Sequence, residues 1–135
     1  MPPRIETSTP ANVMTPIGPY SHIAKCGELI MISGTAGTDP ETNELVGPDI
    51  ASQTTQILDS FELMLLSVGS DLGHVLHINV FLADMNDFAE MNHAYEARME
   101  GCRPARTAIS VCGLPKPGAL VTMNLTAVSK QSVEQ

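Results

Sequence analysis

Two stretches of the chain carry apolar residues at helical spacing, and short apolar runs typical of strands flank both of them. The longer stretch follows Asp49, a residue type that caps helices, and ends at Gly69, a residue type that terminates them. The shorter stretch follows a turn at 84–87 and runs from Phe88 to about Glu100. The order strands, helix, strand, helix, strands predicts an α/β (α+β) fold, with two helices on one face of a mixed sheet.

The longer helix is expected to be amphipathic, with one face turned to the sheet and the other to solvent. The positions expected to face the sheet are Ile50, Thr54, Ile57, Phe61, Met64, Leu65 and Val68. The positions expected to face solvent are Gln53, Gln56, Asp59 and Glu62. Such a helix covers only one side of a sheet. An aliphatic sheet face cannot stay in water, so oligomerisation is expected to cover the other side.

Four strands are expected, at 28–34, 74–83, 107–111 and 120–128. The first has a short apolar run and is expected to be buried on both faces and to end at Gly34. The first dozen residues are rich in Pro, Ser and Thr and are expected to extend along the surface. The segment 16–21, with two prolines and a glycine, is expected to form a turn.

Size and charge narrow the class of protein. A chain of 135 residues is expected to form one domain, with a core at about 17–128. The net charge of −8 argues against a nucleic-acid partner, because binding to phosphates needs a basic face. No apolar run approaches the roughly 20 residues of a membrane span, so no membrane partner is expected.

The cysteines and the start of the chain point to a reducing compartment. Cys26, Cys102 and Cys112 form no CxxC pair and are an odd number, which makes a poor disulfide framework and a poor zinc site. The first residues lack the basic and then apolar layout of a signal peptide. We therefore expect free thiols and a cytoplasmic protein.

Arg106 is the residue best placed to hold a small anion. Pro104 restricts the chain just before it, and a strand is expected to begin at Thr107, so the arginine is fixed by its neighbours. A guanidinium group can hold a carboxylate through two parallel hydrogen bonds. A salt bridge to one of the fifteen acidic residues explains the same position equally well.

A few other polar residues lie near the ends of expected elements. Tyr20, Ser33 and Asn92 each fit a surface or turn position when taken alone, but Gly34 after Ser33 would let the backbone approach a ligand closely. His22 lies close to Tyr20 and can face a pocket. None of the four histidines has the spacing of a metal site, and no phosphate-binding or nucleophile motif occurs, so no metal or cofactor is expected.

Several short motifs, taken together, resemble the RidA family, also called the YjgF/YER057c/UK114 family. The resemblance rests on the order and spacing of the whole set, from about Ile17 to Val128. The motifs are GPYS at 18–21, ISG at 32–34, QTTQ at 53–56, VFLADMNDF at 80–88, MN at 91–92, PAR at 104–106 and LPK at 114–116.

The resemblance implies a chorismate-mutase-like fold assembled as a homotrimer, with ligand clefts between subunits. It implies hydrolysis of reactive 2-imino acids, and of their enamine tautomers, to 2-oxo acids and ammonia without cofactor or metal. It also implies that Arg106 holds the carboxylate of the substrate. The residues it places along the same cleft are Tyr20, Ser33, Gly34 and Asn92.

One departure from the family pattern bears directly on the chemistry. In the deaminase branch the last strand carries a glutamate that orients the attacking water. Here that position falls on Thr122, or on Asn124 if the insertion in the preceding turn is placed differently. A threonine hydroxyl can position water but is no base near neutral pH. General-base help is worth roughly a hundred- to ten-thousandfold in rate. Two smaller departures are Thr35, where glutamine is common, and Ala108, where cysteine is common.

Three functions stay open on the sequence. The first is an imine or enamine deaminase that uses Arg106 and Thr122 on a specialised substrate, with either the substrate itself or His22 as the base. The second is a non-catalytic, regulatory trimer that binds small carboxylates. The third is an endoribonuclease or translation inhibitor, which the charge of −8 disfavours.

Overall fold

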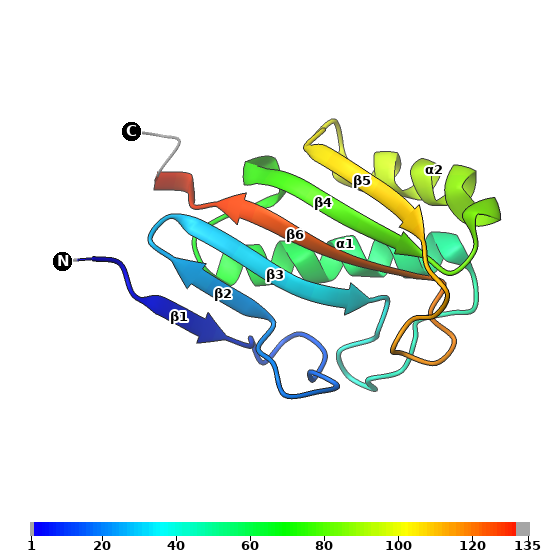
Figure 1. Cartoon of the computed structure of the whole chain (residues 1–135), viewed down its shortest axis with the longest axis horizontal. Helices are drawn as coiled ribbons and strands as arrows, with labels where there is room; N and C mark the ends of the chain where they lie inside the picture. The colour runs from blue at the N-terminus through cyan, green and yellow to red at the C-terminus, as the bar shows by residue number, and fades with distance from the viewer. Residues whose placement is uncertain (1, 132–135) are drawn as a thin grey trace.

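In the part of the chain that the structure describes, six strands form one mixed sheet, and two helices form a second layer on one of its faces (Figure 1). The computed structural model describes residues 2–131. The strands are β1 (Ile5–Ser8), β2 (Ile23–Cys26), β3 (Leu29–Ala36), β4 (Val75–Leu82), β5 (Ala105–Ser110) and β6 (Val121–Val128). They lie side by side in the order β1-β2-β3-β6-β4-β5, and only β4 and β5 run parallel.

The helices are α1 (Ile50–Ser67) and α2 (Phe88–Met99), with short 3₁₀ turns η1 (Leu72–His74) and η2 (Met85–Asp87) before β4 and α2. The Asp49 carboxylate accepts a hydrogen bond from the Ser52 amide at 2.9 Å, so the predicted cap of α1 is confirmed. Gly69 follows α1 at φ 79°, a conformation that favours glycine and ends the helix. The predicted layout of two helices on one face of a mixed sheet is confirmed.

The core lies between the helices and the sheet. Ile57 and Phe61 of α1 are fully buried, and they meet strand residues such as Ile30 and Ile78, which are also fully buried. Gln53 was expected on the solvent face of α1, and this was wrong, because the residue is 0% exposed. Its amide pairs with backbone groups of two loops, which satisfies its polar atoms inside the protein.

Several predicted boundaries of the strands were wrong. The N-terminal region contains β1 and β2, which the sequence did not predict, and β5 begins at Ala105 rather than Thr107. The strand predicted to end at Gly34 continues to Ala36 through an irregularity in its pairing with β6 between Ile32 and Thr35. A residue inserted by such a bulge is typical of strands near functional sites.

The strand at 29–36 was also predicted to be buried on both faces, and this was wrong as well. Its side chains alternate, so Ile30 and Ile32 are buried while Leu29 and Met31 are about half exposed. The exposed side chains belong to the sheet face that carries no helix, which is the nearer face in Figure 1. That face mixes apolar residues with polar pairs, among them Asn79 with Asn124 at 2.8 Å. Its assembly with other copies stays a prediction.

Candidate functional site

Arg106 lies near the start of β5 and points at aromatic rings of α2. The central carbon of its guanidinium lies 4.8 Å from the centroid of the Tyr95 ring and 5.8 Å from that of Phe88. A guanidinium stacked on aromatic rings is attracted to their faces and is held in a fixed plane. Its only hydrogen-bond contact within residues 2–131 is a long one, 4.0 Å from Nη1 to Met91 Sδ.

No carboxylate of the described residues forms a salt bridge with Arg106. Glu96 lines the same cavity as Arg106, but its carboxylate pairs with Arg103 at 3.1 Å. Of the two explanations that the sequence offered for Arg106, the internal salt bridge is therefore not what the described part of the chain contains. The guanidinium keeps its donors free for a ligand.

A cavity of about 440 Å³ surrounds this arginine. Asn92 and Tyr95 of α2 contribute to its wall, together with the loop between α2 and β5. The Asn92 Oδ1 and the Tyr95 hydroxyl are both buried and lack a hydrogen-bond partner among the described residues. Burial raises the pKa of Tyr95, so the hydroxyl keeps its proton near neutral pH and can donate a hydrogen bond. One free cation beside unpaired polar groups suits a small anion that can also form hydrogen bonds.

A second cavity, of about 650 Å³, lies at the other end of the predicted site. Its wall includes Tyr20, Ser33, Gly34 and Thr122, four of the residues that the sequence singled out. Tyr20 belongs to the loop before β2, Ser33 and Gly34 lie at the irregularity of β3, and Thr122 belongs to the neighbouring strand β6.

Local hydrogen bonds tie the loop at 17–21 to the end of β3. The Ser33 hydroxyl donates to the carbonyl of Ser21 at 2.7 Å. The Tyr20 hydroxyl accepts from the amide of Ile17 at 3.3 Å, which closes the turn predicted at 16–21. A side chain on Gly34 would put its Cβ 3.5 Å from Thr122 Cγ2, so the glycine leaves room above the threonine. The wall is thus built from backbone and hydroxyl groups around an open centre.

The structure divides the predicted site residues between the two cavities, which share no residue. Arg106 and Asn92 line the first, and the other four line the second. The order of strands explains the division, because β6 and β4 lie between β3 and β5. Within one chain, the residues expected along one cleft are therefore not together.

Sequence reasoning missed Tyr95 and Lys116. Tyr95 looked like one more position on the buried face of α2, but a buried tyrosine hydroxyl normally has a partner, and that was the available signal. Lys116 appeared only within the LPK motif, and it lines the second cavity while its ammonium donates to the carbonyl of Asn43 at 2.8 Å. Tyr95 places a polar group beside Arg106, and Lys116 adds a positive charge to the other cavity.

Neither a disulfide nor a cluster of possible metal ligands occurs in the described part of the chain. The three cysteines are free, and Cys102 lines the cavity of Arg106. Residues 2–131 contain no group of three or more His, Cys, Asp or Glu side chains placed to hold a metal ion. Over the same residues, neither helix has the length and hydrophobicity that crossing a membrane requires.

Comparison with known proteins gives consistent matches along the chain. Residues 10–129 match the family described as endoribonuclease L-PSP. A RutC family protein of Pyrococcus horikoshii is 43% identical over 105 residues, which cover 78% of this chain and 83% of that protein. The 2-iminobutanoate/2-iminopropanoate deaminase of Mus musculus is 38% identical over 112 residues, covering 83% of this chain and 82% of the mouse protein.

Solved structures match the fold closely. The crystal structure of yeast Mmf1 has a TM-score of 0.88 at 28% identity and covers 94% of this chain and 100% of its own. RidA from the Antarctic bacterium Psychrobacter sp. PAMC 21119 has a TM-score of 0.86 at 32% identity, covering 91% of this chain and 98% of its own. The six-stranded sheet with two helices is therefore the architecture of these proteins.

Proposed function

This chain belongs to the endoribonuclease L-PSP (YjgF/RidA) family, and from that membership we propose that it hydrolyses a reactive 2-imino carboxylate, or its enamine tautomer, to a 2-oxo acid and ammonia. The observation that carries the proposal is the guanidinium of Arg106, which faces a cavity and has no carboxylate partner within residues 2–131. The mouse relative named 2-iminobutanoate/2-iminopropanoate deaminase supports the class of substrate. Such substrates carry a carboxylate next to the reactive carbon.

The catalytic cleft lies, in this proposal, between two copies of the chain in a homotrimer. One copy supplies Arg106 and Asn92, and the next supplies the wall with Gly34 and Thr122. The separation of the two cavities within one chain supports this arrangement, since neither cavity alone holds both halves of the predicted site. The sheet face without helices supports it further, because exposed apolar side chains there favour association.

Hydrolysis needs the carboxylate held, the nitrogen protonated and a water aimed at the carbon. Arg106 binds the carboxylate through two charge-assisted hydrogen bonds, and the Tyr95 hydroxyl donates a further one. The Thr122 hydroxyl positions the water from the opposite wall. Water adds to the imine carbon, the nitrogen takes up protons, and the C–N bond breaks to leave the 2-oxo acid and ammonia. The iminium carbon is already electrophilic, so positioning alone gives measurable turnover.

A second candidate function is binding of a small carboxylate without turnover. The observation that favours it is the lack of any Asp or Glu among the residues that line the cavity of Thr122. In that case Arg106 still binds the carboxylate, but hydrolysis is no faster than in solution. The two functions share one ligand class and differ only in the rate of the chemical step.

The nuclease that appears in the description of the family fits this chain less well. The chain has only seven Lys and Arg residues at a net charge of −8. Three of them, Arg98, Arg103 and Lys130, already pair with acidic side chains. A phosphate backbone needs a continuous basic face, and this composition provides few free cations for one.

The proposal is tested with imines that are generated enzymatically in the assay mixture. An amino-acid oxidase generates 2-iminopropanoate or 2-iminobutanoate from the amino acid, and semicarbazide traps whatever imine remains. Addition of the protein is expected to lower the rate of semicarbazone formation, with heat-denatured protein as the control. Unchanged semicarbazone formation, together with measurable binding of the 2-oxo acid, would instead establish the carboxylate-binding function.

A further inference from the structure

His22 lies in the wall of the second cavity, and one of its two ring nitrogens has no hydrogen-bond partner among the described residues. The side chain is 2% exposed, and its Nε2 lies 2.7 Å from the carbonyl oxygen of Met14. A carbonyl oxygen only accepts hydrogen bonds, so in the neutral ring Nε2 carries the hydrogen and Nδ1 keeps a lone pair. Nδ1 is buried and has no partner among the described residues.

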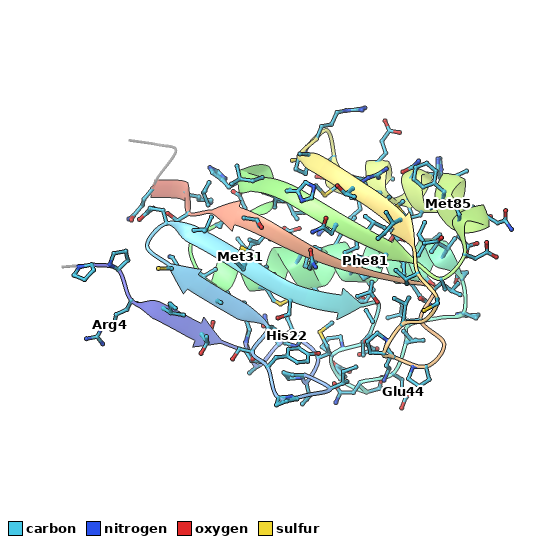
Figure 2. All side chains as sticks on the ribbon, in the orientation of Figure 1. Arg4, His22, Met31, Glu44, Phe81 and Met85 are labelled. Carbon is cyan, nitrogen blue, oxygen red and sulfur yellow. The ribbon has the colours of Figure 1, made fainter. Side chains whose placement is uncertain are left out.

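His22 and Thr122 line the same cavity. The carbonyl of His22 accepts from the amide of Ser33 at 2.9 Å, which fixes His22 beside the irregularity of β3. Gly34, the next residue, faces Thr122 across the strand pair. The ring of Tyr20 meets that of His22 edge-on, with centroids 5.9 Å apart. Figure 2 shows His22 where β2 begins, alongside β3.

The titratable groups of this cavity are few. Tyr20, His22 and Lys116 line it, and no Asp or Glu does. Phenol and ammonium groups ordinarily titrate near pH 10, whereas imidazole is the side chain whose ordinary titration falls near neutrality. Lys116 is a donor only and already binds the carbonyl of Asn43. His22 is thus the one side chain of this wall that offers a nitrogen lone pair without a partner among the described residues.

We propose that His22 is the general base of this chain, acting at the place where the deaminase branch carries a glutamate. The inference rests on the proposed deaminase function. The Thr122 hydroxyl holds a water, and Nδ1 takes one of its protons as the oxygen bonds to the carbon of the protonated imine, an iminium ion. The imidazolium returns that proton to the nitrogen of the tetrahedral intermediate. As the C–N bond breaks, the hydroxyl proton passes through Nδ1 to the departing ammonia, which leaves as ammonium.

The variant His22→Gln tests the proposal, because glutamine can still donate to the Met14 carbonyl but cannot accept a proton as a base. We expect kcat/KM for 2-iminopropanoate to fall about a hundredfold or more, within the usual range for general-base catalysis. A protonated base cannot act, so we also expect the wild-type rate to fall at acidic pH and this fall to be absent from the variant. Binding of pyruvate should stay within about twofold, since Arg106 is untouched. The matched control is His93→Gln, an exposed histidine of α2 that lines neither cavity.

Two outcomes separate this inference from the proposed function. If the wild type hydrolyses the imine and His22→Gln matches it in rate and pH profile, His22 is not the base, while the deaminase function stands. If the wild type hydrolyses no imine, the function fails and the inference fails with it. Recovery of rate in the double variant His22→Gln/Thr122→Glu would support the proposal further, because a carboxylate then supplies the missing base.

A measurement on the unmodified protein keeps the proposal falsifiable if the variant does not fold. Long-range ¹H–¹⁵N spectra report which nitrogen of each imidazole carries hydrogen. Single glutamine variants at His74, His77 and His93 assign the fourth signal to His22 by elimination. We expect an unprotonated Nδ1 whose shift moves when pyruvate fills the cleft. A protonated Nδ1 in the neutral ring, or no change at saturating pyruvate, would overturn the proposal.

Discussion

Arg106 is held by aromatic rings instead of acidic side chains, and this decides what it can bind. Cation–π contact fixes the guanidinium plane over Tyr95 without neutralising its charge. A salt bridge would have used the same donors that a ligand needs. The charge therefore stays available, and the cavity around it is the strongest reason to expect a carboxylate.

Removal of this side chain should abolish ligand binding. Hydrogen bonds to charged groups are worth about 1.5–3 kcal/mol each, and Arg106 supplies two of them to a carboxylate, so Arg106→Ala should weaken pyruvate binding by about a hundredfold or more. Calorimetric titration measures the loss. Arg103→Ala is the matched control, because that arginine lines the same cavity but is 80% exposed and pairs with Glu96. Binding that survives Arg106→Ala would refute the assignment.

The Tyr95 hydroxyl allows a finer test of the same cavity. This hydroxyl is buried and has no partner among residues 2–131, which costs the ligand-free protein about 1–3 kcal/mol, so Tyr95→Phe should not lower the free energy of unfolding. The ring that stacks on Arg106 is retained. If the hydroxyl donates to the ligand, pyruvate binding should weaken by about three- to tenfold, the usual value of one hydrogen bond. Denaturant titration and calorimetry measure the two effects, and weaker stability with unchanged binding would show a purely structural role.

A site residue could be singled out from the sequence where the residues next to it, or a family motif around it, indicated its position. Arg106 was identified because Pro104 and the following strand fix it, and the family motifs strengthened that choice. Tyr95 was not, because its spacing on a helix is that of a core residue. The distinction depends on whether its hydroxyl finds a partner, and partners come from distant parts of the chain.

At the scale of elements, α1 shows how a helix can be predicted correctly while one of its residues is misplaced. Its bounds follow from Asp49, the apolar spacing and Gly69. Gln53 was placed in solvent because it is polar, yet its Nε2 donates to the carbonyl of Gly47 at 2.9 Å and its Oε1 accepts from the amide of Leu120 at 2.8 Å. It therefore joins α1 to the loops before α1 and before β6. Only the tertiary structure supplies those partners.

Loss of Gln53 should accordingly destabilise the protein. Gln53→Ala leaves the partly buried amide of Leu120 without this partner, which should lower the free energy of unfolding by about 1–3 kcal/mol. Urea titration followed by circular dichroism measures the change. Gln56→Ala is the matched control, since Gln56 lies on the same helix and its amide donates to the Ser60 hydroxyl rather than to another part of the chain. Equal stability of the two variants would contradict the assigned role.

The strands were predicted less well than the helices, for a physical reason. β1 has four exposed residues and no alternation of apolar and polar side chains, so only its pairing with β2 defines it as a strand. Periodicity carries no signal where neither face is buried. The extension of β3 past Gly34 was hidden in the same way, because an irregular register with β6 breaks the pattern just where the candidate site lies.

At the scale of the whole molecule, the order of strands is what the sequence could not provide. The spacing of apolar residues predicted the helices, the strands and their two layers. It did not predict that β6 and β4 lie between β3 and β5. That order puts Arg106 and Gly34 in different cavities of one chain. The family motifs suggest one cleft, and in the proposed function a second copy of the chain completes it.

Complementation between inactive variants tests that requirement. Arg106→Ala should inactivate one half of the cleft and Gly34→Val the other, because a branched side chain fills the space above Thr122. When both chains are co-expressed with different tags and mixed oligomers are isolated by both tags, some clefts combine two unaltered halves. In a cyclic trimer, every mixed oligomer has one cleft of the three that joins two unaltered halves, so about a third of wild-type deaminase activity should return. If each chain formed a complete site by itself, no cleft would be repaired and the mixed oligomers would be as inactive as their parents.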